Sequence, residues 1–241
     1  MARTVDEEAH TRRREAFLDA AEELMLTQDS EAITVAELVK ATAASKGAFY
    51  HYFDSKDALM DALLHRMLDR IVAAITPIAD EGTLTAPDKI TALIEAIAVW
   101  KGRHRHLLVA ATTIWHGADN AHARSRLRRR TADEVGAVMA TIVAQGNAEG
   151  SFEADEPTVA GRLTYLALQE LNDEVRDRLS TRRHDPTALD GVVERFEAYS
   201  ATINRMLGAP VGTIRLASPD QLRRWYAQVF DRGAIDDDTT Q

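Results

Sequence analysis

The residues best suited to chemistry lie in the segment 45–56, which reads Ser-Lys-Gly-Ala-Phe-Tyr-His-Tyr-Phe-Asp-Ser-Lys. Over about two helical turns it presents a lysine, a histidine and two tyrosines, with Phe49 and Phe53 as the core anchors. Surface tyrosines are costly unless they touch something. A sugar–phosphate backbone is a suitable partner, because the ring packs on sugar while the hydroxyl donates to phosphate. The segment therefore indicates contact with nucleic acid.

Two short helices are expected to position this segment. Thr34 is a good N-cap residue and Glu37 follows three residues later, which is the pattern of a capping box. A break at residues 42–44 follows, and Ser45 then caps a third helix that runs through Tyr52. Two helices of this length joined by so short a turn form a helix-turn-helix, which we place at residues 34–52.

The rest of the chain predicts an all-α fold, because period-3.6 patterning recurs and no alternating run is found. We expect a three-helix N-terminal domain over residues 1–56, a larger helical domain over 57–232 and a disordered tail over 233–241. Helices are predicted over residues 12–27, from 34 to the break at 42–44, 45–52, from 54 or 55 to a stop or kink near Pro77, 87–101, 105–116, 120–147, 157–179, 187–207 and 219–230.

The composition limits the possible functions. The 241 residues contain no cysteine, which excludes disulfides, thiolate metal sites and cysteine nucleophiles. The net charge of -9 argues against nucleic acid in general, but Lys40, Lys46 and Lys56 face only Asp54 within residues 40–56. The first 14 residues lack the apolar run of a signal peptide, and no stretch approaches the roughly 18 apolar residues of a membrane span. We expect a soluble cytoplasmic protein.

Residues 12–68 resemble the N-terminal domain of the tetracycline-repressor (TetR) family of transcription regulators. The matching pieces are Phe-Leu-Asp-Ala-Ala-Glu-Glu-Leu-Met at 17–25, Ile-Thr-Val-Ala-Glu-Leu-Val at 33–39, and above all residues 45–53 followed by Ser-Lys-Asp-Ala-Leu at 55–59. The resemblance implies a repressor that binds a palindromic operator in double-stranded DNA as a homodimer and is released by a small-molecule effector. It implies no enzymatic activity, no cofactor, no metal and no membrane partner.

The turn departs from the family pattern. Where the family usually has Ala-Gly-Val-Ser, this chain has Thr42, Ala43, Ala44 and Ser45. Glycine relieves a positive φ in such a turn, and alanine there costs about 1 kcal/mol. We therefore expect a slightly strained turn.

The resemblance also assigns contacts, residue by residue. At the start of the second helix, Thr34 would hold a phosphate through its hydroxyl and backbone amide. Lys46 is the best candidate to read guanine O6 and N7, and Gly47 permits close backbone approach. The full set of implied DNA contacts is Thr34, Ser45, Lys46, Gly47, Ala48, Tyr50, His51, Tyr52 and Lys56. The arginines 12–14 could also reach the adjacent backbone or minor groove, and a solvated helix start is the alternative for them.

The larger domain offers two further sets of residues. Apolar residues recur every three or four positions in its last two long helices, and similar proteins pair these helices across a dimer; the alternative is that the same stripes serve the core of one subunit. The dimer residues are Leu163, Leu171, Val175, Val192, Phe196, Tyr199 and Ile203. The candidates for the effector pocket combine apolar bulk with a polar group, and core positions are the alternative for each: Trp100, Trp115, His116 and Tyr165.

Two other classes of protein stay open. An all-α enzyme lacks support because the chain has no Gly-rich phosphate loop, no His-Glu-x-x-His and no serine elbow, although a carboxylate pair is not excluded. A ligand-sensing helical module without DNA contact is the third hypothesis. The basic run at residues 124–130 fits a solvated helix face better than a second nucleic-acid surface.

Overall fold

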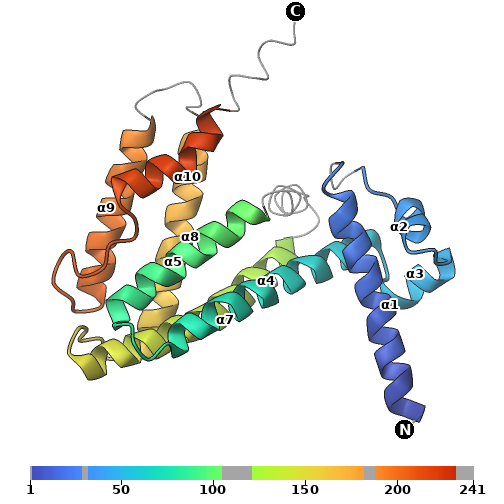
Figure 1. Ribbon diagram of the computed structural model, residues 1–241, viewed down its shortest axis with the longest axis horizontal. Coiled ribbons are helices and arrows are strands. Elements are labelled where there is room, and N and C mark those ends of the chain that lie inside the picture. Colours follow the sequence, from blue (N-terminus) through green and yellow to red (C-terminus); the bar gives the residue numbers. More distant parts are fainter. Residues whose placement is uncertain (1, 29–31, 105–120, 182–187, 232–241) are drawn as a thin grey trace, which may run out of the picture. The chain divides into compact units, whose positions relative to one another are not determined.

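The computed structural model describes residues 2–28, 32–104, 121–181 and 188–231. Every regular element in these ranges is an α-helix, which confirms the all-α prediction (Figure 1). The helices are α1 (Ala2–Leu24), α2 (Val35–Ala41), α3 (Lys46–Tyr52), α4 (Lys56–Asp80), α5 (Ala86–Arg103), α7 (Ala121–Glu149), α8 (Pro157–Thr181), α9 (Ala188–Met206) and α10 (Pro219–Asp231). No helix in the described ranges has the length and apolar character needed to cross a membrane.

The helices form two compact units. The N-terminal unit contains Met1–Ile71 and Trp100–Arg129, and the C-terminal unit contains Val72–Val99 and Arg130–Gln241. Three helices, α4, α5 and α7, therefore contribute residues to both units.

Most predicted helices are found within a few residues of their expected ends. The first begins at Ala2 rather than at residue 12, since nothing in residues 2–11 breaks a helix. Pro77 does not end α4, which continues to Asp80. The predicted helix over residues 105–116 lies outside the described residues.

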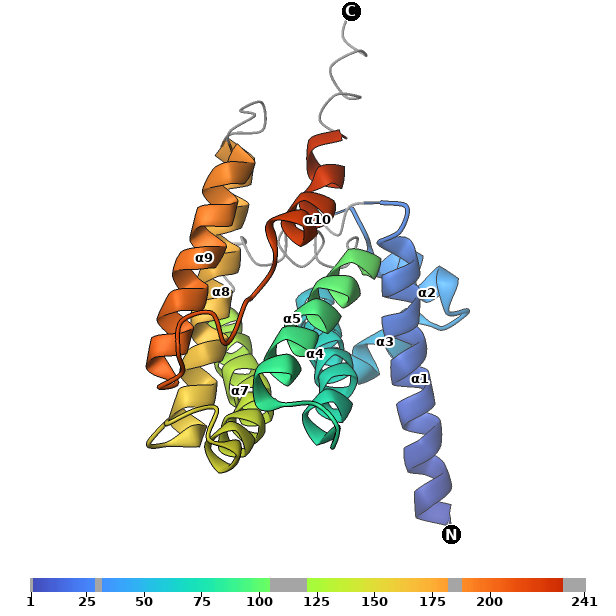
Figure 2. The same cartoon turned by 60° about the vertical axis from the view of Figure 1, so that its left-hand side comes forward.

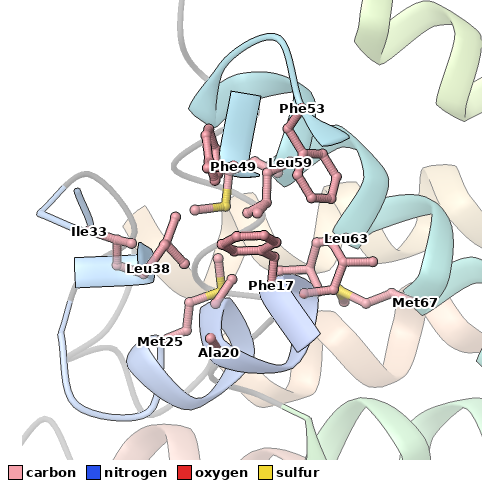
Figure 3. Close-up of a cluster of buried hydrophobic side chains, with 13 residues drawn as sticks. Phe17, Ala20, Met25, Ile33, Leu38, Phe49, Phe53, Leu59, Leu63 and Met67 are labelled. Atoms are coloured by element: carbon pink, nitrogen blue, oxygen red, sulfur yellow. The ribbon is translucent and has the colours of Figure 1, made fainter. Parts of the chain in front are cut away.

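The core of the N-terminal unit is built on aromatic rings from α1 and α3. Phe17 and Phe49 are fully buried and meet edge to face, with ring centroids 5.5 Å apart. Leu38 of α2 and Leu63 of α4 complete this contact region (Figure 3). Since four helices supply side chains to one cluster, the orientation of α3 is set by packing and not by its own seven residues.

The C-terminal unit is held by close helix packing and by buried polar contacts. Helices α8 and α9 lie side by side (Figures 1 and 2). A Cβ at Gly161 of α8 would lie 2.4 Å from the backbone nitrogen of Ala140, so α7 and α8 approach closely there. The buried ammonium of Lys89 donates to the carbonyl oxygen of Ala79 and to Oε1 of Gln145, both at 2.6 Å, which joins the end of α4 to α5 and α7.

Candidate nucleic-acid interface

The helix-turn-helix is defined by two side-chain caps, as the sequence predicts. Glu37 donates its backbone N–H to Oγ1 of Thr34 at 3.3 Å, and the Glu37 carboxylate accepts the N–H of Thr34 at 2.8 Å. Ser45 caps α3 by accepting the N–H of Ala48 at 3.0 Å. Both caps satisfy backbone donors that have no partner inside the helix, so α2 and α3 start where these residues stand.

The turn contains the backbone strain that its composition predicts. Ala43 has φ 48° and is the only non-glycine residue with positive φ in the described part of the chain. The N–H of Ala44 donates to the carbonyl of Val39 at 3.0 Å, which closes the end of α2 over this residue. Alanine therefore occupies the position where glycine would be free of strain.

Replacing Ala43 by glycine is expected to raise the free energy of unfolding by about 0.5–1 kcal/mol. The left-handed conformation costs alanine roughly 1–2 kcal/mol, and the greater freedom of glycine in the unfolded chain offsets about 0.4–1 kcal/mol of the relief. Denaturant unfolding measures the difference. Ala41→Gly, two residues earlier at the last residue of α2, is the control and should be destabilising. An Ala43→Gly variant less stable than the wild type would contradict the interpretation that the positive φ of Ala43 is strained.

Helix α3 separates a buried face from an open one. Phe49 and Phe53 are buried, whereas Lys46, Tyr50 and His51 are exposed. Ser45 and Gly47 are exposed at the start of the helix, and Ala48 is half-buried. The structure thus brings most of the predicted DNA-contacting residues of α3 onto one surface, with a lysine, a phenol and an imidazole directed away from the core.

Tyr52 lies differently from the other predicted contacts. It is half-buried, and its ring lies 6.1 Å from the ring of Phe17 and 4.6 Å from that of His10, both in α1. His10 was missed by sequence reasoning, although it precedes Phe17 by seven residues and so lies on the same side of α1 as Phe17.

Two of the predicted phosphate contacts already have partners within the chain. The hydroxyl of Thr34 donates to Oε2 of Glu37 at 2.8 Å, and so does its backbone N–H. Lys56 donates from Nζ to the carbonyl oxygen of Ile33 at 2.9 Å, which ties the start of α4 to the residue before the α2 cap. Any phosphate at these positions has to share or replace these interactions.

A group of ion pairs fixes α1 on α4. The Arg66 guanidinium meets Glu15 at 3.1 Å, Asp19 at 2.7 Å and Glu22 at 2.6 Å. Arg70 adds a second pair with Glu22 at 2.8 Å. Burial lowers the pKa of Arg66, but the three carboxylates, Glu22 foremost, raise it above its ordinary value. Helix α1 is thus joined to α4 by ion pairs, in addition to its apolar contact with α3.

The arginines 12–14 of α1 differ in exposure and in their contacts within the chain. Arg12 is exposed and lies 3.7 Å from Glu8. The Arg14 guanidinium lies over the Phe53 ring, 5.3 Å from its centroid, and 3.3 Å from Glu15. Arg13 is exposed. Arg12 and Arg13 are therefore more accessible to a partner than Arg14.

Two of the four predicted effector residues lie among the described residues. Trp100 packs against the core of the N-terminal unit and stacks on His104 with ring centroids 4.2 Å apart. Tyr165 is buried in the C-terminal unit. Trp115 and His116 lie outside the described residues.

The predicted dimer residues divide into one exposed and several internal positions. Leu163 of α8 is exposed, together with Val159 and Leu166, and these three lie one helical turn apart on one face. The hydroxyl of Tyr199 donates to Glu174 at 2.8 Å, and burial together with this bond raises the pKa of Tyr199 to about 12. The remaining positions are buried in the single chain: Leu171, Val175, Val192, Phe196 and Ile203.

Comparison with known proteins places the helix-turn-helix in a described family. Residues 17–63 match the family model for bacterial regulatory proteins of the tetR family. The matched range covers the core side chains of α1, both caps of the helix-turn-helix and the first turns of α4. The resemblance found in the sequence is confirmed.

Three curated relatives differ in how much of the chain they share. The nucleoid occlusion factor SlmA of Photobacterium profundum is 28% identical over 82% of this chain and 97% of its own length. The transcriptional repressor KstR2 of Rhodococcus jostii is 28% identical over 40% of this chain and 52% of its own length. The repressor NemR of Escherichia coli is 34% identical over 33% of this chain and 40% of its own length.

Solved structures share the fold across most of the chain. A TetR transcription regulator from Haloarcula marismortui superimposes with TM-score 0.59 at 21% identity, over 78% of this chain and 96% of that one. Reduced NemR of E. coli gives TM-score 0.54 at 22% identity, over 82% and 99% of the two chains. RolR in complex with resorcinol gives 0.56 at 15% identity, over 92% and 96%.

Proposed function

We propose that this chain is a ligand-responsive repressor, because residues 17–63 match the model for bacterial regulatory proteins of the tetR family and two of its relatives are transcriptional repressors. In this proposal a homodimer binds a palindromic operator through two copies of the helix-turn-helix, and a small-molecule effector releases it. DNA contact places its action in the cytoplasm. Residues 1–56 form the DNA-binding domain and residues 57–232 the effector-binding and dimerisation domain.

The observation that carries this proposal is the open face of α3. Lys46, Tyr50 and His51 are exposed there, while Phe49 behind them is fully buried. A helix fixed by its core and open along the opposite face can enter the major groove with its side chains already directed at base edges and phosphates. Lys46, in the first turn, is the residue we assign to guanine O6 and N7.

Dimerisation supports the proposal because one short helix makes few base contacts. Two-fold symmetry doubles them over a palindrome. We assign the dimer surface to the exposed stripe of α8, formed by Val159, Leu163 and Leu166. Three large apolar side chains open to solvent on one helix face are suited to cover the same stripe of a second copy.

The proposed effector response uses α4, which contributes Lys56–Ile71 to the N-terminal unit and residues 72–80 to the C-terminal unit. In one state of the dimer the two recognition helices have the spacing of the operator half-sites, and in the other state they do not. A ligand that binds the second state more tightly releases DNA, with a coupling free energy of about 1–3 kcal/mol between ligand and DNA binding. RolR was solved with resorcinol, which supports a small organic effector for this fold. Trp100, Trp115, His116 and Tyr165 remain our candidate effector contacts.

Selection of bound sequences from random duplex DNA tests the proposal. We expect an enriched palindrome, with affinity that falls steeply as salt rises because phosphate contacts release counterions. An enzyme or a ligand sensor without DNA contact would enrich no palindrome. Recovery of unenriched DNA from the wild-type protein would overturn the proposal.

Replacing Lys46 by alanine should weaken operator binding by about 1–3 kcal/mol and relax the preference at one base pair in each half-site, because one base contact is lost. Competition binding against operators altered at single positions measures both effects. Lys40→Ala removes the same charge from an exposed position on α2 and should leave the base preference unchanged. Equal preferences for the wild type and the Lys46→Ala variant would refute the assignment of Lys46.

Replacing Glu37 by glutamine should tighten operator binding roughly threefold at low salt, since a negative charge is removed next to the phosphate proposed at Thr34. The pKa of Glu37 is held below its ordinary value by hydrogen bonds from Thr34, backbone first, so the carboxylate is charged at neutral pH. Glutamine keeps an acceptor for the Thr34 N–H. Glu23→Gln makes the same change at an exposed site of α1. An unchanged affinity for Glu37→Gln would remove Thr34 from the phosphate contacts.

A further inference from the structure

We propose that His10 is a positioning residue of the DNA-reading surface, and that its ring holds His51 and Tyr52 of α3 in the conformation that meets DNA. The inference rests on the proposed function, because it assigns a role to one side chain of α1 in operator recognition. It makes the first half of α1 part of the reading unit, in addition to the helix-turn-helix.

The three rings form a closed cluster. The His10 ring centroid lies 4.6 Å from that of Tyr52 and 5.6 Å from that of His51, and the His51 and Tyr52 centroids are 5.0 Å apart. The two contacts made by His51 are edge to face, with interplanar angles of 74° and 79°. The contact between His10 and Tyr52 is tilted, with an interplanar angle of 55°. Each ring therefore contacts the other two, and the two contacts of His51 have the edge-to-face arrangement that aromatic rings prefer.

His10 has no part in the core of the N-terminal unit. The first residue of that core is Phe17. The N-terminal end of α1 extends beyond α3 (Figures 1 and 2). His10 is exposed, and Glu8, Thr11 and Arg12 beside it are exposed as well. An imidazole at this position removes little apolar surface from water, so its contacts with α3 are its main structural consequence.

The contacts of His10 restrict the side chains of His51 and Tyr52 on α3. His51 is exposed, and without His10 its ring would contact only Tyr52 among the rings of the cluster. The Tyr52 ring contacts those of both Phe17 and His10, so loss of His10 removes the closer of these two contacts. Side chains that are ordered before binding lose less conformational entropy when DNA arrives, which favours the complex and sharpens its base preference.

The test compares His10→Ala with His10→Phe in the full-length dimer, using the operator found by selection. We expect His10→Ala to weaken operator binding about 3- to 10-fold and to relax the preference at the position nearest His51. His10→Phe keeps a ring in the cluster and should bind within about twofold of the wild type. His104→Ala is the matched control, since it removes an imidazole that stacks on Trp100 instead.

A double-mutant cycle separates positioning from direct contact. If His10 acts through His51, the effects of His10→Ala and His51→Ala on operator binding are not additive, and the double variant resembles His51→Ala. If His10→Phe binds as weakly as His10→Ala, His10 contacts DNA through its ring nitrogens and the positioning role is overturned. The role is also overturned if His10→Ala changes neither affinity nor base preference.

A measurement without DNA keeps this inference distinct from the proposed function. In the free protein, His10→Ala should shift the ring resonances of His51 and Tyr52, because each lies within ring-current distance of His10. Unshifted resonances would overturn the cluster itself. Shifted resonances in a protein that selects no operator would instead overturn the repressor proposal and leave His10 without a role in recognition.

Discussion

Replacing Arg66 by methionine is expected to lower the free energy of unfolding by about 2–3 kcal/mol. The Arg66 side chain is only 12% exposed, and it is the cation that faces Glu15, Asp19 and Glu22 of α1. Removing one partner of a buried ion pair typically costs about 3–5 kcal/mol, because the remaining charges lose their compensation. Asp19 is 63% exposed, and water recovers part of that loss, which places the expectation below the usual range.

Denaturant unfolding followed by circular dichroism measures this difference. Arg70→Met is the matched control, since Arg70 is more exposed and, among the described residues, pairs with Glu22 alone; it should cost less than about 1 kcal/mol. Adding Asp19→Asn to Arg66→Met should recover part of the loss, because among the described residues the Asp19 carboxylate pairs with Arg66 alone, whereas Glu22 keeps its pair with Arg70. Equal effects at positions 66 and 70 would show that the ion pairs do not lock α1 to α4.

The ion pairs between α1 and α4 are also expected to affect operator binding. Helix α1 contributes Phe17 to the core that orients α3, and its partner α4 is the helix proposed to carry the effector response. We therefore expect Arg66→Met to weaken operator binding even where the protein remains folded, since the orientation of α1 beside α3 is less well defined.

Replacing Leu163 by aspartate is expected to convert the dimer to monomer, with the dissociation constant of the dimer raised by roughly 100-fold or more. Leu163 is 45% exposed in the single chain and lies at the centre of the stripe formed with Val159 and Leu166. Each copy contributes one such residue, so the substitution removes two leucines from the interface and requires two carboxylates to lose water. Each lost leucine costs about 1.5–3 kcal/mol, before the cost of burying the charges is counted.

Analytical ultracentrifugation measures the shift, and operator binding should fall with it because a monomer meets only one half-site. Thr158→Asp is the control, since residue 158 is exposed on α8 but off the stripe. Val192→Asp should behave differently again: Val192 is fully buried inside the subunit, so that variant should unfold and not merely dissociate. A Leu163→Asp protein that remains dimeric would exclude this face of α8 from the interface.

The sequence by itself determined the elements whose signals are local. Thr34 and Glu37 lie three residues apart and Ser45 caps the next helix, so both starts of the helix-turn-helix could be read from hydrogen-bonding requirements alone. The positive φ of Ala43 was expected from the family resemblance, because the family usually has glycine at this place in the turn. The family motif in residues 45–59 could also be recognised without any structure.

Only the tertiary structure decided which helices pack against one another. Hydrophobic periodicity gives the apolar face of a helix but not what covers it. The stripe of Val192, Phe196 and Ile203 suggested a dimer seam, yet these residues are buried within the subunit, while Val159, Leu163 and Leu166 of α8 are exposed.

The same holds for contacts between distant residues. Arg66 lies 51 residues from Glu15 along the chain, and no local pattern relates them. His10 likewise meets His51 only because packing of Phe17 against Phe49 lays α1 across α3. A capping hydrogen bond depends on residues that are neighbours in the sequence, whereas the packing of one helix on another depends on the whole core. For that reason the caps were predictable and the α1 contacts were not.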